Sequence, residues 1–218
     1  MVIGAYFDES IRQEGEESIC VGGYLFKPSQ YVRFRQRWHR EVLRLPDRRQ
    51  LRYFRMADIC AGQGVCAGLD IPTRMGVLKR AVDVVGDCAY GAVGVHFLQA
   101  EFVALAPPDF AKYRGSIYSQ ACGMIPQVTA FRLREWGCGN MEVLYVFERG
   151  HKFQSEANDI LGAMARDPRA VKQFKYRHMF EEKEREYGLQ AADLFAWRHD
   201  EGALNQRRSD PPRFQAVY

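Results

Sequence analysis

The stretch VIGAYFDES, residues 2–10, decides the fold. Its first six residues form a nearly unbroken apolar run, which is typical of a strand buried on both faces, and Asp8 closes that run. A second run, VLYVF at residues 143–147, is closed by Glu148 in the same way. In open α/β sheets, ligands gather where the carboxyl ends of buried strands meet. Because an isolated carboxylate is costly to ionise at a buried edge, the two acids predict a shared cation, a shared proton or a basic partner.

A third acid, Asp193, interrupts the apolar stripe of the predicted last helix, since Leu189 lies four residues before it and Ala196 three after. Buried carboxylates are rare unless they are paired. Asp193 is therefore expected to be a metal ligand, and a structural bridge to an arginine or to Lys183 is the alternative. Asp8 and Glu148, each taken alone, also fit solvated strand ends.

Hard divalent cations such as Mg²⁺ and Mn²⁺ are held by a few carboxylates and leave positions open for phosphate oxygens. Two such ions about 4 Å apart activate water and stabilise the leaving oxygen in phosphodiester cleavage. We therefore expect Mg²⁺ or Mn²⁺, as two ions, on Asp8, Glu148 and Asp193. Strand alternation puts the neighbouring Glu9 on the opposite face from Asp8, so Asp8 is the better ligand of the two.

Length and composition indicate a soluble globular protein. The chain has 218 residues, 47% of them hydrophobic, and contains no Pro/Gly/Ser-rich linker, which predicts a single domain over 1–205 and a flexible tail over 206–218. No long apolar run or secretory signal is evident, so we expect a cytoplasmic protein without membrane contact. The six cysteines and five histidines show no zinc-ligand spacing. The oligomeric state is left open.

The most basic stretch of the chain runs from Tyr31 to Arg55 and mixes nine arginines with aromatic residues. Arginines neutralise phosphates and aromatic rings stack on unpaired bases, which predicts a nucleic-acid partner, RNA or DNA. Arg33, Arg37 and Arg40 are the expected phosphate contacts. A solvated outer face of an amphipathic helix explains the same pattern equally well.

Hydrophobic periodicity predicts an α/β fold whose mixed sheet is an antiparallel hairpin followed by helix-separated parallel strands, flanked by helices. The expected strands are residues 3–8, 19–26, 90–98, 141–147 and 171–180. The expected helices are residues 30–45, 72–85, 109–136, 153–165 and 189–201. A polar turn at 12–17 closes the hairpin, and a glycine-rich loop covers 60–68.

Five motifs, in this order along the chain, carry a resemblance to a known family: YFDES at 6–10, GGYLF at 22–26, FRMAD at 54–58, VFERG at 146–150 and LQAADL at 189–194. The chain resembles the bacterial family labelled domain of unknown function 3800, which belongs among the ribonuclease H-like folds. The resemblance implies a ribonuclease H-like sheet with Asp8, Glu148 and Asp193 at the acidic metal-ligand positions, accompanied by Glu9 and Gln190. The chain departs from many members at Ile11, where they carry glycine, and at Arg55, where they carry histidine.

These patterns favour a divalent-metal-dependent nuclease. The expected catalytic residues are Asp8, Glu9, Glu148 and Asp193, and the expected substrate contacts are Gln190, Lys183, Arg55 and Ser10 together with the arginines of the basic stretch. The alternative is a catalytically inactive module of the same fold that binds nucleic acid or protein, in a mobile element or a defence system. A phosphotransferase with Asp8 as nucleophile is a weaker hypothesis, because that chemistry usually has a second aspartate where Ser10 stands.

Overall fold

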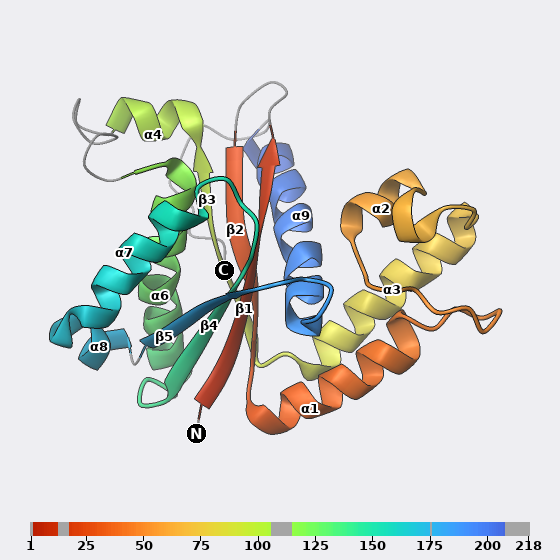
Figure 1. Cartoon of the computed structure of the whole chain (residues 1–218), viewed down its shortest axis with the longest axis horizontal. Coiled ribbons are helices and arrows are strands. Elements are labelled where there is room, and N and C mark those ends of the chain that lie inside the picture. Colours follow the sequence, from red (N-terminus) through yellow and green to blue (C-terminus); the bar gives the residue numbers. More distant parts are fainter. Residues whose placement is uncertain (1, 13–17, 106–114, 175, 208–218) are drawn as a thin grey trace.

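The computed structural model describes residues 2–12, 18–105, 115–174 and 176–207, and it contains a mixed five-stranded sheet of order β3-β2-β1-β4-β5 (Figure 1). The strands are β1 (Val2–Arg12), β2 (Ser18–Phe26), β3 (Gly91–Leu98), β4 (Glu142–Glu148) and β5 (Tyr176–Glu181). The central strand β1 pairs antiparallel with β2 and parallel with β4, which in turn pairs parallel with β5. The predicted α/β class, with a mixed sheet opened by an antiparallel hairpin, is confirmed.

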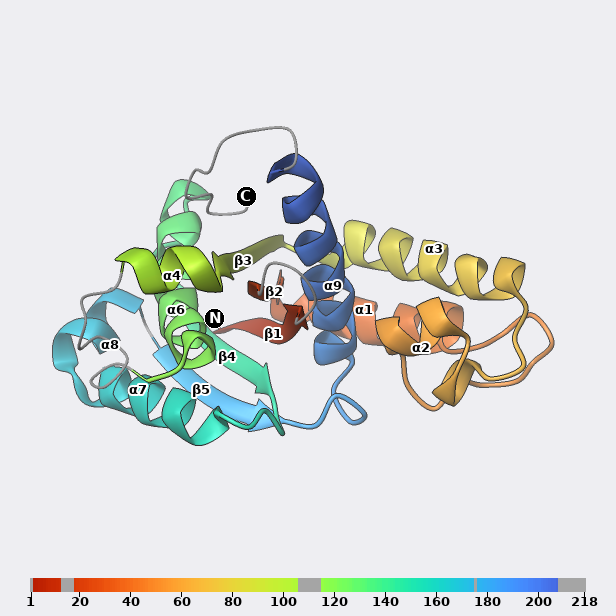
Figure 2. The same ribbon diagram turned by 90° about the horizontal axis from the view of Figure 1, so that it is seen from above.

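Helices cover both faces of this sheet. Helix α9 (Tyr187–Arg207) packs on β1 and β2 from one side, while α6 (Ile117–Glu135) and α7 (Gln154–Arg166) cover the other (Figure 1). The shorter α4 (Gln99–Leu105) and α8 (Pro168–Phe174) lie on the α6 side. Beyond α9 stand the segments α1 (Pro28–Arg37), η1 (Trp38–Val42), α2 (Met56–Ala61), η2 (Gly64–Cys66) and α3 (Ile71–Cys88) (Figure 2). No described helix is both long enough and apolar enough to cross a membrane.

Strand alternation divides the core into two layers, one on each face of the sheet. Tyr6 and Val146 belong to the cluster that packs against α9, α1 and α3, while Phe7 and Phe147 belong to the cluster beneath α6 and α7. A residue that follows Phe7 or Phe147 therefore points back toward α9.

Two glycines bring α9 close to the sheet. A Cβ atom on Gly22 would collide with the Phe195 ring, and one on Gly23 would collide with the backbone carbonyl oxygen of Tyr6. Gly22 also stands opposite Asp8 in the β1–β2 register. The helix that carries Asp193 consequently lies directly over the strand that carries Asp8, and no side chain on the neighbouring strand separates them.

The direction of β3 corrects the prediction of parallel strands after the hairpin, because β3 pairs antiparallel with β2. The backbone N–H of Tyr90 donates to the carbonyl of Leu25 (2.7 Å), so the chain re-enters the sheet at the same end where β2 leaves it. The helical segment between β2 and β3 thus connects adjacent ends of two antiparallel strands and is not a crossover between parallel strands.

Three local predictions were right only in part. The predicted glycine-rich loop at 60–68 contains the end of α2 and the 3₁₀ turn η2, and residues 171–174 of the predicted strand belong to α8. The predicted helix at 30–45 ends its α-helical part at Arg37 and continues as the π-helical turn η1. The turn at 12–17, the start of the helix at 109–136 and the tail at 206–218 lie largely outside the described residues, so the domain extent stays a prediction.

Candidate functional site

Asp8 and Glu148 meet at the centre of the sheet, where the pairing of β1 with β4 stops. Phe7 stands opposite Phe147 in that register, so the next residue of each strand is an acid. Glu148 is the last residue of β4, as predicted, but β1 continues past Asp8 to Arg12. Asp8 therefore lies inside its strand and not at its end, which explains why only 1% of it is exposed.

Lys183 places its ammonium group among three carboxylates. It lies in the connection between β5 and α9, and its Nζ is 2.6 Å from Asp8 Oδ2, 3.0 Å from Glu148 Oε2 and 3.1 Å from Asp193 Oδ1. Burial by itself would lower the pKa of Lys183, but the surrounding carboxylates outweigh it and raise that pKa. Lys183 is therefore a permanent cation at the centre of the acidic cluster.

The acids around Lys183 do not share the same protonation behaviour. Burial raises the pKa of Asp8 well above its usual value, while a hydrogen bond with Asp8 and the charge of Lys183 more than offset burial and lower the pKa of Glu148. Burial thus makes Asp8 harder to ionise than the neighbouring Glu148.

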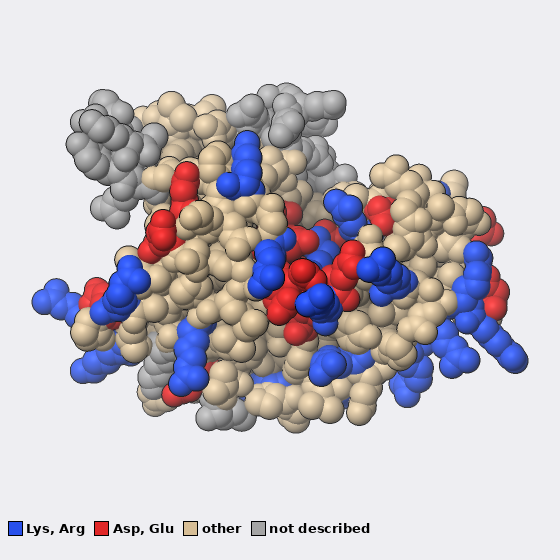
Figure 3. Space-filling view, in the orientation of Figure 1, with Lys and Arg blue, Asp and Glu red and all other residues tan. Residues whose placement is uncertain are grey.

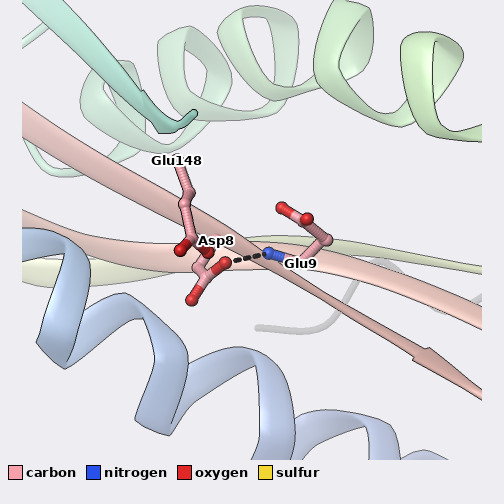
Figure 4. A group of neighbouring side chains, drawn as sticks. All are labelled: Asp8, Glu9 and Glu148. Carbon is pink, nitrogen blue, oxygen red and sulfur yellow. Dashed lines mark hydrogen bonds between the residues drawn. The ribbon is translucent and has the colours of Figure 1, made fainter. Parts of the chain in front are cut away.

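Glu9 extends the cluster toward the other face of the sheet. Its backbone N–H donates to Asp8 Oδ1 (2.8 Å), and its carboxylate points away from α9 (Figure 4). Burial, followed by the charge of Glu148, raises the pKa of Glu9 to about 7. One carboxylate oxygen from each of Asp8, Glu9 and Glu148 lies within 4.8 Å of the others, an arrangement that suits a metal ion.

Asp193 and Gln190 connect this cluster to the neighbouring helices. Asp193 Oδ2 accepts a hydrogen bond of 2.6 Å from the backbone N–H of Met56 at the start of α2. Asp193 is not part of the three-acid group found among the described residues, and Lys183 links it to Asp8 and Glu148. The bridge between Asp193 and Lys183 that was the alternative interpretation is thus present.

Gln190 is fully buried, and both ends of its amide are engaged within the protein. Its Oε1 accepts hydrogen bonds from Trp38 Nε1 (2.9 Å) and from the backbone N–H of Phe54 (3.0 Å), and its Nε2 donates to the backbone carbonyl of Lys183 (3.1 Å). The side chain expected to contact substrate therefore supports the site from beneath and fixes the segment that carries Lys183.

A cleft of about 690 Å³ opens above the acids. Its floor includes Glu9, Glu148, Lys183 and Asp193, and cationic side chains from two separate segments stand around them: Arg55, Arg149 and Lys152. Figure 3 shows the acidic side chains gathered at the middle of this face, with lysine and arginine side chains surrounding them. The cleft thus combines a negative floor with a positive rim.

The predicted substrate contacts fall into two groups. Ser10, Arg55 and Lys183 line the cleft, but Arg33, Arg37 and Arg40 do not appear among its described lining residues. Arg37 instead binds Glu41 and Asp87, and Arg40 binds Glu41. The basic stretch therefore divides into an end that reaches the cleft, at Arg55, and a helix that stands apart from it.

The lining residues that were not predicted include His151, Lys152 and Trp197. The first two follow Glu148 in the turn through Gly150, where a positive φ of 114° redirects the chain. Trp197 lies one helical turn after Asp193 and therefore on the same side of α9. Proximity in sequence to the two predicted acids was the available signal for all three.

Comparison with solved structures finds likenesses in shape. The ribonuclease H2 from Pyrococcus horikoshii OT3 superposes with a TM-score of 0.46 and 12% sequence identity, over 100% of this chain and 80% of that one. No family model matches the chain, and no curated protein matches it. The resemblance to the family labelled domain of unknown function 3800 therefore stays a prediction, and the assignment below draws on side-chain geometry alone.

Proposed function

We propose that the chain is a divalent-metal-dependent nuclease that hydrolyses phosphodiester bonds in RNA or DNA. The observation that carries this proposal is that one carboxylate oxygen from each of Asp8, Glu9 and Glu148 lies within 4.8 Å of the others, and that Glu9 and Glu148 line a cleft with a cationic rim. Phosphate polymers are drawn to such a rim, and carboxylates on the floor are the ligands that Mg²⁺ and Mn²⁺ prefer.

The residues present fit a hard divalent cation. All the candidate donor atoms are carboxylate oxygens, and one oxygen from each of Asp8, Glu9 and Glu148 lies within 4.8 Å of the others. Asp8, Glu9 and Glu148 would hold the ion. When bound, it would polarise a phosphate oxygen and activate water for attack.

The remaining cleft residues would act on the nucleic acid itself. Arg55 and Lys152 approach from separate segments of the chain and would hold phosphates on either side of the bond to be cleaved. Trp197 offers an aromatic surface for an adjacent base. Asp193 would keep α2, and with it Arg55, in place through its bond to the Met56 N–H.

A second candidate function follows from the contacts of Lys183. Because its ammonium pairs with Asp8, Glu148 and Asp193, the acids have a cationic partner without any metal. This favours the alternative of a non-catalytic module that binds nucleic acid or protein through the rim of the same cleft.

The test is cleavage of labelled single-stranded RNA, single-stranded DNA, duplex and hybrid substrates with Mg²⁺ or Mn²⁺, and with a chelator instead. We expect Asp8→Asn and Glu148→Gln to lose more than about 100-fold in rate, since even outer partners of a metal site contribute about 10–100-fold. The matched control is Asp83→Asn, an exposed aspartate paired with Lys79 on α3, which should cleave normally. Equal rates in all four proteins, or cleavage that survives the chelator, would overturn the proposal.

A further inference from the structure

Lys183 has the features of a fixed part of the site and not of a mobile surface residue. Only 11% of its side chain is exposed, and its backbone carbonyl accepts from Gln190 Nε2 at 3.1 Å. Further along the same connection, Glu186 accepts a hydrogen bond from the Tyr31 hydroxyl. The chain therefore holds the Lys183 ammonium in place by contacts on both sides of it.

The position of Lys183 Nζ matters for how many ions the cluster can take. Carboxylate oxygens bind Mg²⁺ at about 2.0–2.1 Å, so an ion placed between Asp8, Glu148 and Asp193 would occupy the same space as the ammonium group. The group formed by Asp8, Glu9 and Glu148 does not include Asp193, and it extends through Glu9, whose carboxylate points away from α9. Asp8 and Glu148 are common to both sets.

We propose that Lys183 is a built-in second cation, so that this site binds one divalent ion and not two. The inference rests on the metal site proposed above and specifies its stoichiometry. Asp8 and Glu148 would contribute to both positive centres, the metal that they would hold with Glu9 and the ammonium that they hold with Asp193. One ion and Lys183 bring three positive charges to the four acids Asp8, Glu9, Glu148 and Asp193, whereas two ions and Lys183 would bring five.

This arrangement also gives Lys183 a part in substrate binding. Its three N–H donors face Asp8, Glu148 and Asp193, and it lines the cleft, so its positive charge can attract a phosphate oxygen while it stays paired with the acids beneath. A point charge of this kind can stabilise negative charge at the position where a second ion would otherwise act.

The test counts bound Mn²⁺ per folded chain, from the loss of the free-ion electron paramagnetic resonance signal and by calorimetry. Wild type should bind one ion, Lys183→Met should bind two, and Lys183→Arg should bind one. The matched control is Lys79→Met, which removes an exposed lysine that pairs with a single aspartate and should leave the count at one. Two ions in wild type, or one ion in a folded Lys183→Met protein, would overturn the inference.

A second variant keeps the test decisive if Lys183→Met does not fold. Asp193→Asn removes a partner of Lys183 but no ligand of the proposed ion, so the number of bound Mn²⁺ ions should stay at one. The Kd for Mn²⁺ should stay within about threefold of wild type, which is smaller than the 10–100-fold loss typical when a residue that orients a metal ligand is removed. Loss of metal binding in Asp193→Asn would assign that residue to a metal and refute the proposal.

One bound ion without any cleavage would instead refute the nuclease function and leave the stoichiometry standing, and no binding by wild type would refute both.

Discussion

Replacing Gln190 by leucine should destabilise the protein far more than its place at the start of a helix would indicate. The amide oxygen of Gln190 accepts from Trp38 Nε1 and from the Phe54 N–H, and all three residues are 0% exposed. Leucine has a similar volume but no acceptor. The substitution would therefore leave two buried donors without partners and would free the carbonyl of Lys183.

The magnitude follows from these two donors. A buried donor without a partner costs about 1–3 kcal/mol, so Gln190→Leu should lower the free energy of unfolding by roughly 2–6 kcal/mol. That is a large part of the roughly 5–15 kcal/mol that stabilises a typical folded protein. The matched control is Gln127→Leu on α6, an exposed glutamine whose amide donates to the Gly123 carbonyl, where the change should stay within about 0.5 kcal/mol.

The assay is urea unfolding followed by tryptophan fluorescence and by far-ultraviolet circular dichroism. Trp38 is itself buried and is one of three tryptophans, so its emission reports on the contact that is changed. Coincident transitions by both signals would justify two-state treatment. A Gln190→Leu protein as stable as Gln127→Leu would refute the reasoning, because Gln190 could not then be satisfying buried donors.

Three further predictions concern titration, close packing and salt dependence. The pKa of Glu9 is raised to about 7 from 4.5, so Glu9 ionises at a lower pH in the unfolded chain than in the folded one, and metal-free protein should lose up to about 3 kcal/mol of stability as pH rises from 5 to 8, at 1.36 kcal/mol per pH unit. In thermal melts of chelator-treated protein, Glu9→Gln should make stability depend less on pH. The same pH dependence in both proteins would contradict this prediction. Gly23→Ala should lower the melting temperature, because its Cβ atom would collide with the backbone carbonyl of Tyr6, whereas Gly86→Ala in α3 meets nothing and should gain about 0.5–1 kcal/mol. Similar shifts for both variants would show that β2 does not need a glycine at residue 23 to pack beside β1. Arg55→Gln should reduce the slope of log Kd for nucleic acid against log salt by about 0.7–0.9. The triple replacement of Arg33, Arg35 and Arg44 should leave that slope unchanged if the cleft alone binds, and a reduced slope would bring the helix into the interface.

Strong local patterns were enough to predict the parts of the fold that position the acids. The apolar runs that end at Asp8 and Glu148 are neighbouring strands, and Asp193 lies on a helix packed against them. Each of these signals is a pattern of apolar residues along one strand or helix, and such a pattern can be read directly from the sequence. The convergence of the three acids around one cation could therefore be anticipated, but Lys183 was expected only as an alternative partner of Asp193 and not as a partner of all three.

The role of Lys183 had no comparable signal. It lies within EEKERE, residues 181–186, where charges of both signs alternate as they do on solvated surfaces. Whether one lysine of such a segment turns inward depends on how β5 and α9 meet, which is a property of the tertiary structure. Gln190 was predicted to contact substrate for the same reason. Its burial results from the packing of Trp38 and Phe54 against α9, which local sequence does not record.

The antiparallel direction of β3 was equally inaccessible from local patterns. A long helical connection between two strands usually indicates a parallel crossover, and the sequence from α1 to α3 has that length. The direction of β3 depends on the end of the sheet at which the chain re-enters. The hydrogen bond from the Tyr90 N–H to the Leu25 carbonyl fixes that end, and it joins residues far apart in the chain.

The two neighbours of β1 set the order in which the acidic cluster is assembled during folding. The hairpin partner β2 follows β1 closely in sequence, whereas Glu148 and Lys183 arrive only after long loops have closed. Asp8 can thus remain hydrated while the hairpin nucleates, and it loses its water when its counter-ion reaches it. Substitutions at this cluster should accordingly change how long the native protein survives before unfolding and scarcely change how fast it forms.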